Sequence, residues 1–270
     1  MLGYAEAGDR GGAPVLFFHG TWLSQVAHLG EAPARAGVRL LYVDRPGYGR
    51  SDALPGRTLL DWPRDVAAVA DALELDAFAV VGYSGGASHA LACAAALPER
   101  VRCAAVVSGV GPALEVAAVT AAIRPERRQQ VERARIDPDG AWRLVADEVE
   151  AEVEEVAANP DPFVSLDDPG LRQRIEAALR ETAARGPEGP VSDLALNYLR
   201  PWGFRLERIA APVFVWHAEN DEDVPVGVGR AVADLLPEAR RQFTRAGGHL
   251  LLWTRAEDIL VDVQTARNTA

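Results

Sequence analysis

Short apolar runs alternate with longer helical stretches over most of the chain. Runs rich in apolar residues, each too short for a helix of its own, occupy residues 14–18, 38–43, 78–81, 101–107 and 212–217, and a last strand is expected at Arg241-Gln-Phe-Thr244. They indicate buried strands, and residues 2–7 are expected to add a short edge strand. Helical stretches are predicted at residues 61–75, 87–97, 226–236 and 255–267. Strands that alternate with helices predict an α/β fold in which a mostly parallel central sheet is covered by helices on both faces.

The alternation stops after Gly111 and resumes near residue 206. The intervening residues contain no convincing strand and consist of Arg- and Glu-rich helical stretches separated by prolines. We therefore predict a core domain of residues 1–111 and 206–270 and a helical lid (cap) subdomain of residues 112–205.

Within the predicted lid, apolar residues recur at helical spacing opposite an acidic face, which predicts packing inside a helical subdomain: Trp142, Val145, Val149, Val153 and Val156. Aromatic residues flank these helices and are candidates to line a pocket: Phe163, Tyr198, Trp202 and Phe204.

The strongest chemical signal is Gly82-Tyr-Ser-Gly-Gly86, which lies between a predicted strand and an Ala-rich helical stretch. Ser84 is therefore expected on a sharp turn, where glycines let two backbones approach closely. This context turns the weak pattern G-x-S-x-G into a nucleophile elbow. The turn lifts the Ser84 hydroxyl clear of the sheet and aims the free N–H groups of the helix N-terminus at its target. An ordinary glycine-rich turn is the alternative.

A serine hydroxyl needs a neighbouring base to accept its proton, and the chain has five histidines. His249 is predicted to be the base, because it follows the last strand in a flexible Gly-Gly turn, on the same edge of the sheet as Ser84. His217, at the end of a buried strand, is the main alternative. Of the other histidines, His19 is expected to hold its loop in shape by hydrogen bonding. His28 is expected to be solvated, and His89 to turn away into the fold.

A carboxylate must hold the imidazole in the correct tautomer and stabilise its charge during the reaction. The loop after His217 is rich in acids and lies at another carboxyl end of a strand. We predict Asp221 as the acid, because it lies four residues before Pro225. Asp223 and then Glu219 are the alternatives as the acid, and a solvated acidic loop without a catalytic role is the alternative to all three.

Attack on a carbonyl creates an oxyanion that needs hydrogen-bond donors already in place. The backbone N–H of Gly85 is predicted as one donor, and that of Thr21, in the bend after Gly20, as the other. Trp22 is expected at the edge of the substrate pocket or packed under the lid. Tyr83 and Trp202 are further predicted substrate-binding residues.

Composition narrows the classes of partner. The 270 residues carry a net charge of −11, and the pI is near 5.0, which argues against nucleic acid or an anionic membrane as a partner.

No apolar run approaches the length of a membrane span, and the first ten residues lack the basic-then-apolar order of a signal peptide, so a cytoplasmic location is expected. Every basic side chain is Arg, which excludes a Lys Schiff base. No metal motif and no cofactor are predicted, and the partner is a small-molecule substrate.

His19-Gly20, the segment from Asp44 to Ser51, the elbow, Asp221-x-x-x-Pro225 and Gly248-His249 occur in this order. In this respect the chain resembles α/β-hydrolase fold proteins over residues 2–111 and 205–270. The resemblance implies a nucleophile, an acid, a base and two oxyanion donors at Ser84, Asp221, His249, Thr21 and Gly85. It also implies a scaffold-stabilising role for the segment 44–51. The short N-terminus leaves room for one leading strand in place of the family's usual hairpin.

The nucleophile limits the chemistry that this resemblance allows. Haloalkane dehalogenases and epoxide hydrolases of this fold carry Asp at the elbow, so Ser84 argues against both. We predict a serine hydrolase that cleaves an ester or related acyl bond of a small to medium, largely apolar substrate. A carbon–carbon bond hydrolase or a non-hydrolytic tailoring enzyme would use the same three residues. A ligand-binding receptor of the same fold is the alternative outside enzymes. An exposed lid face could support a homodimer.

Overall fold

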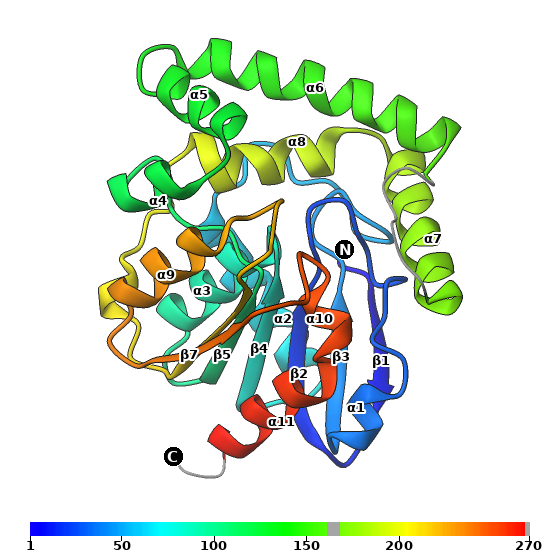
Figure 1. The fold of residues 1–270 in the computed structure, drawn as a ribbon. Coiled ribbons are helices and arrows are strands. Elements are labelled where there is room, and N and C mark those ends of the chain that lie inside the picture. The colour runs from blue at the N-terminus through cyan, green and yellow to red at the C-terminus, as the bar shows by residue number, and fades with distance from the viewer. Residues whose placement is uncertain (161–167, 268–270) are drawn as a thin grey trace.

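Seven strands form one sheet in the computed structural model, which describes residues 1–160 and 168–267 (Figure 1). The strand order is β1-β3-β2-β4-β5-β6-β7. In chain order the strands are β1 (Tyr4–Gly8), β2 (Ala13–Phe18), β3 (Val38–Val43), β4 (Phe78–Tyr83), β5 (Val101–Val107), β6 (Val213–Ala218) and β7 (Ala239–Thr244). Only β1 pairs antiparallel, with β3, so the structure confirms the single leading strand and the mostly parallel sheet.

The strand register brings the important loops to one edge. Phe18 is paired with Gly82, Gly82 with Val106, and Val106 with Val215. The carboxyl ends of four neighbouring strands are therefore nearly level. Because loops that follow parallel strands leave from the same edge, the segments after β2, β4 and β6 meet there.

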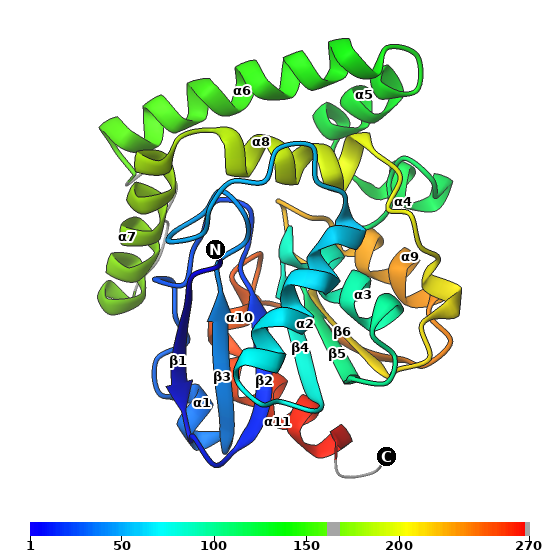
Figure 2. The ribbon, with the colours of Figure 1, turned by 180° about the vertical axis from the view of Figure 1, so that it is seen from behind.

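Alternate strand residues face two hydrophobic cores, as expected for a sheet that is covered on both sides. In β4, Phe78 and Val80 pack with α2 (Trp62–Ala72), α3 (Gly86–Ala96) and α9 (Val226–Leu235). Ala79 and Val81 pack on the other face with α1 (Ala32–Arg35), α10 (Leu251–Thr254) and α11 (Ala256–Arg267). Figure 2 shows α2 and α3 in front of the sheet, and Figure 1 shows α1 and α11 in front of its other face.

A group of helices lies between β5 and β6 in sequence and beyond the carboxyl edge of the sheet in space (Figures 1 and 2). We call this group the helical insertion: α4 (Ala117–Ala122), α5 (Pro125–Ala134), α6 (Pro138–Ala158), α7 (Pro169–Arg185), α8 (Glu188–Leu194) and the π-helix η3 (Ala195–Leu199). Its described residues include no strand, as predicted.

The long helix α6 buries the predicted apolar stripe. Val145, Val149 and Val156 are at most 1% exposed, and Trp142 and Val153 are partly buried against the cores. Burial of one such side chain contributes about 1.5–3 kcal/mol. The stripe therefore holds the insertion together, as expected.

Short helical pieces are where the fold departs from the sequence prediction. Helices α1 and α10 were not predicted, because four residues are too few to show a helical period. A 3₁₀ turn, η1 (Leu59–Asp61), precedes α2, and another, η4 (Leu206–Arg208), precedes β6. Helix α2 ends at Ala72, before the predicted residue 75, because Glu74 has a φ of 54°, which is incompatible with a right-handed helix. None of the helices in the described residues is long and apolar enough to cross a membrane.

Candidate active site

Ser84 occupies the predicted turn between β4 and α3. Its φ of 50° is unfavourable for a residue with a Cβ, and such strain persists only where the surroundings impose it. Two close approaches impose it here. A Cβ on Gly82 would lie 2.4 Å from the Gly86 carbonyl oxygen, and one on Gly86 would lie 2.2 Å from that of Phe18. The glycines thus let β2, β4 and α3 converge tightly enough to present Ser84 at the sheet edge.

Three residues from distant parts of the chain form a continuous hydrogen-bonded row at this edge. The Ser84 Oγ lies 3.0 Å from Nε2 of His249. The other ring nitrogen of His249, Nδ1, lies 3.0 Å and 3.1 Å from the two carboxylate oxygens of Asp221. Because Asp221 accepts the Nδ1 proton, Nε2 is left unprotonated and faces the hydroxyl. This arrangement can remove a proton from Ser84 as the oxygen attacks.

Asp221 is held ionised by its surroundings. Burial alone would raise the pKa of this carboxyl group, but hydrogen bonds from His217 and His249 and from the Val224 backbone outweigh it. The result is a pKa well below its usual range. The backbone N–H groups of Asp223 and Val224 both donate to Oδ1, at 3.0 Å and 2.9 Å, and so fix the rotation of the carboxylate.

The remaining histidines have other roles. His217 is fully buried behind Asp221: its Nε2 lies 2.7 Å from the Val224 carbonyl oxygen and 3.4 Å from the Asp221 carboxylate. It therefore contacts the predicted acid, and no hydrogen bond joins it to Ser84 among the described residues. His28 is exposed, whereas His19 and His89 are buried, as expected.

The structure brings the two predicted oxyanion donors close to each other. A Cβ on Gly20 would lie 3.4 Å from that of Ser84, and one on Gly85 would lie 2.2 Å from Oγ1 of Thr21. Neither the Thr21 nor the Gly85 N–H has a hydrogen-bond partner within the described part of the chain. Two free N–H groups beside the serine are what a developing oxyanion requires.

The three predicted substrate-binding residues occupy different environments. Trp22 is partly exposed and packs between both cores, so it can border a pocket. Tyr83 is 3% exposed, and its ring packs against the rings of His249 and Trp253 at centroid distances of 5.2 Å and 5.0 Å. Its ring thus contacts the predicted base.

Trp202, the third predicted substrate-binding residue, is also buried. It is 2% exposed, stacks near Phe204 and donates its indole N–H to the Asn197 carbonyl oxygen at 3.3 Å. An indole that is closed in on its faces and satisfied at its N–H is a packing residue in this structure. Tyr198 is likewise 8% exposed, and Phe163 lies outside the described residues.

The segment 44–51 has the stabilising contacts that were expected of it. The Asp44 carboxylate accepts hydrogen bonds from the Gln25 and Arg50 backbone N–H groups, at 2.8 Å and 3.2 Å, while Ser51 Oγ donates to the Asp44 carbonyl oxygen at 2.6 Å. A Cβ on Gly49 would lie 2.2 Å from the same carboxylate. These contacts tie the loop after β3 to the loop after β2.

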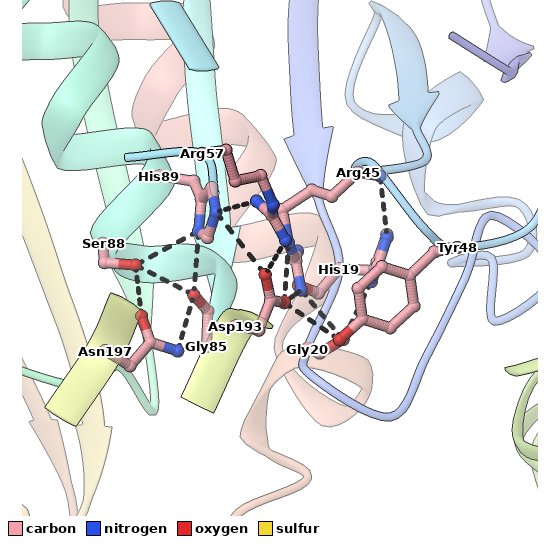
Figure 3. Close-up of polar contacts among 10 residues, drawn as sticks. All are labelled: His19, Gly20, Arg45, Tyr48, Arg57, Gly85, Ser88, His89, Asp193 and Asn197. Carbon is pink, nitrogen blue, oxygen red and sulfur yellow. Dashed lines mark hydrogen bonds and ion pairs between the residues drawn. The ribbon is translucent and has the colours of Figure 1, made fainter. Parts of the chain in front are cut away.

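A buried charged cluster beside the site was missed by sequence reasoning (Figure 3). It joins Asp193 of α8 to Arg45, Tyr48 and Arg57 of the core. Burial would raise the pKa of Asp193, but the two guanidinium groups outweigh this and hold the pKa far below its usual range. One signal in the sequence points to it: Asp193 is the single charged residue in the segment 191–199, where most side chains are apolar.

Asp221, Asp223 and His249 each bring one ligand atom within 4.8 Å of one another, which is close enough for a metal ion. In the described residues, Nδ1 of His249 lies 3.0 Å from the Asp221 carboxylate, so these two side chains form a hydrogen-bonded pair.

Comparison with known proteins gives the family. The chain matches the α/β-hydrolase fold family over residues 13–256. The chain belongs to this family. Within it, the chain is 29% identical to a 2-hydroxy-6-oxononadienedioate/2-hydroxy-6-oxononatrienedioate hydrolase of Cupriavidus pinatubonensis, over 84% of this chain and 75% of that one. It is 25% identical to a bifunctional esterase/perhydrolase of Acinetobacter calcoaceticus, over 96% and 93% of the two chains.

The fold of this α/β-hydrolase is shared with solved structures of low sequence identity. The enol-lactonase from Burkholderia xenovorans superposes with a TM-score of 0.69 at 21% identity, covering all of this chain and 96% of that one. Family membership and the named relatives together show that this α/β-hydrolase is an enzyme of the hydrolase class.

Proposed function

We propose that this α/β-hydrolase cleaves an ester or a related acyl bond, with Ser84 as nucleophile, His249 as general base and Asp221 as the acid that orients it. The observation that carries the proposal is the 3.0 Å distance between Ser84 Oγ and His249 Nε2, with the Asp221 carboxylate 3.0 Å from the opposite ring nitrogen.

In the proposed reaction, Ser84 Oγ attacks the substrate carbonyl carbon while His249 Nε2 takes the hydroxyl proton. The negative charge that develops on the carbonyl oxygen is stabilised by the N–H groups of Thr21 and Gly85. His249 then gives the proton to the leaving group, and an acyl-enzyme is left on Ser84. A water molecule, deprotonated by the same ring, releases the acid.

The surroundings of His249 favour a small to medium substrate with an apolar part. Its side chain is 17% exposed, so the base is reachable from solvent. Trp22 offers a partly exposed indole on the loop that carries Thr21, and indoles favour apolar contacts. We propose the helical insertion as the lid that covers this region.

The test is the hydrolysis of p-nitrophenyl esters of increasing acyl length by the wild-type enzyme and by Ser84→Ala. The proposal expects the variant to lose ester turnover and covalent labelling by a fluorophosphonate. Ser108→Ala is a matched control, because Ser108 also follows a parallel strand with positive φ, at 48°, and its buried Oγ has no hydrogen-bond partner among the residues that the structure describes. Ester hydrolysis that persists in Ser84→Ala would refute the assignment.

A carbon–carbon bond hydrolase is the second candidate, and its support is the named activity of the 29% identical relative. It would use the same three residues on a 2-hydroxy-6-oxo-dienedioate such as the one in that relative's name. Assaying a 2-hydroxy-6-oxo-dienedioate beside the esters separates the two, since the ester proposal expects the higher kcat/KM on esters.

A further inference from the structure

A carboxylate from the helical insertion is buried in the core next to the loop that carries Thr21. Asp193, on α8, has no exposed side-chain surface. Its Oδ2 accepts hydrogen bonds from Nε and Nη2 of Arg45, the former at 3.0 Å, and from the Tyr48 hydroxyl at 3.0 Å (Figure 3). Its Oδ1 accepts one from Nη2 of Arg57 at 2.6 Å. The carboxylate therefore fixes both guanidinium groups in one orientation each.

The two arginines differ in what else they touch. Arg45 extends past Asp193 to donate from Nη1 to the His19 carbonyl oxygen and from Nη2 to the Gly20 carbonyl oxygen at 3.3 Å. Arg57 extends in another direction and contacts the ring of His89 at 3.3 Å. Among the described residues, Arg45 thus bridges the insertion to the oxyanion loop, and Arg57 does not.

The Gly20 carbonyl is held from several sides. Besides Arg45, it accepts hydrogen bonds from Nδ1 of His19 at 2.8 Å and from the Leu23 backbone N–H at 3.1 Å. His19 is the Nδ1–H tautomer, because its Nε2 accepts the backbone N–H of Arg45 at 3.2 Å. Burial, aided by the positive charge of Arg45, lowers the pKa of His19, so the ring stays neutral.

This carbonyl belongs to the same peptide unit as the predicted oxyanion donor. The peptide plane is rigid, and the N–H of Thr21 points opposite to the C=O of Gly20. Whatever fixes the carbonyl direction therefore fixes the N–H direction as well. Donors on the carbonyl also polarise the peptide and strengthen its N–H as a donor.

The buried cluster also carries a net positive charge, because two guanidinium groups face one carboxylate. This excess of positive charge lies next to the site where the oxyanion would form.

We propose that Arg45, held in place by Asp193, is a positioning residue that orients the Gly20–Thr21 peptide to stabilise the oxyanion. The inference deepens the proposed function and rests on it. It makes α8 a structural partner of the oxyanion hole, so that the helical insertion contributes to turnover as well as to substrate access. The effect belongs to the transition state and falls on kcat more than on KM.

The experiment compares Arg45→Lys with Arg57→Lys. Both variants keep the buried positive charge and lose the planar fork, because the single nitrogen of an ammonium cannot occupy the separate positions from which the guanidinium nitrogens donate. Removing an oxyanion donor costs about 10²–10³ in kcat, and a misoriented donor keeps part of that effect. We expect Arg45→Lys to lower kcat about 10-fold to 100-fold, with KM within about threefold of wild type. We expect Arg57→Lys to keep kcat within about twofold of the wild-type value, even if its Tm falls by as much as that of Arg45→Lys.

A second readout is inhibition by a trifluoromethyl ketone, which forms a tetrahedral oxyanion adduct with the serine. Its Ki should rise in Arg45→Lys by about the factor that kcat falls, since both report binding of the same oxyanion. Equal losses of kcat in the two variants, an unchanged kcat in Arg45→Lys, or a loss confined to KM would overturn the inference. By contrast, a wild-type enzyme without Ser84-dependent turnover would overturn the proposed function itself.

A second pair of variants tests the same carbonyl without changing any charge. In His19→Asn the amide NH₂ takes the place of Nδ1 and keeps a donor for Gly20, whereas His19→Leu keeps the bulk and removes the donor. We expect His19→Asn to retain more kcat than His19→Leu, by about threefold or more. Equal kcat in the two folded variants would contradict a role for donors on the Gly20 carbonyl. If Arg45→Lys does not fold, this pair still tests whether the donors on the Gly20 carbonyl affect turnover.

Discussion

Asp221→Asn is the sharpest test of the proposed chemistry, because the surrounding hydrogen bonds dictate how the amide must sit. The backbone N–H groups of Asp223 and Val224 both donate to Oδ1. The amide oxygen must take that position, which leaves the NH₂ group at Oδ2. There it faces Nδ1 of His249 at 3.0 Å and Nε2 of His217 at 3.4 Å.

The amide therefore acts as a donor where the carboxylate accepts. His249 must respond by leaving Nδ1 unprotonated and carrying its proton on Nε2, the atom 3.0 Å from Ser84 Oγ. A ring in that tautomer cannot accept the serine proton. We expect kcat to fall about 10⁴-fold, as in other triads in which this exchange has been made. This corresponds to about 5 kcal/mol of lost transition-state stabilisation.

The assay is ester hydrolysis at neutral pH under saturating substrate, with Tm measured for each variant. Asp223→Asn is the matched control: its side chain is 62% exposed, and only its backbone N–H contacts Asp221. We expect that variant to keep kcat within about twofold. A fall in kcat of less than tenfold in Asp221→Asn would refute the tautomer argument. An equal fall in kcat in Asp223→Asn would also refute it and would make Asp223 the candidate acid again.

Two further predictions concern stability. Burial lowers the pKa of His19 and His89, and the hydrogen bonds and ion pairs described above lower those of Asp193 and Asp221. The unfolded chain therefore binds more protons, so the free energy of unfolding should fall as pH drops below about 6.5, and more steeply below about 4. Urea titrations at pH 7.5, 5 and 3.5 measure this, and a midpoint that rises on acidification contradicts it. Gly86→Ala should cost at least about 1–3 kcal/mol, because its Cβ would lie 2.2 Å from a carbonyl oxygen of β2. In the control, Gly11→Ala, the new Cβ would have 3.6 Å to its nearest neighbour; equal Tm values for the two variants would show that the elbow yields more easily than its packing implies.

The mostly parallel sheet and the meeting of Ser84, His249 and Asp221 at one edge could be predicted from the sequence for a physical reason. Buried strands have a short apolar signature, and in a parallel sheet the loops after them must leave from one edge. Residues that follow separate strands were therefore expected to meet, although 165 positions separate Ser84 from His249. Their distances depend on side-chain packing, which only the structure supplies.

The contacts of the helical insertion could not be predicted in the same way. Arg45 and Asp193 lie 148 positions apart, and no periodicity links a turn after β3 to helix α8, which follows α4–α7 in the helical insertion. The same reason explains why Trp202 and Tyr83 were expected at a pocket. An aromatic side chain favours burial in any setting, and the sequence does not say whether a ligand or another side chain covers it.

The depth of Asp193 in the core has a consequence for exchanging substrate preference between relatives. A chimera that replaces residues 112–205 as a block removes the counter-ion of two guanidiniums that stay behind, and stranded buried charges cost about 3–5 kcal/mol. An exchange limited to α4–α7 leaves α8 in place and keeps that charge balance. The natural crossover point for grafting a new cap onto this scaffold therefore lies just before Glu188.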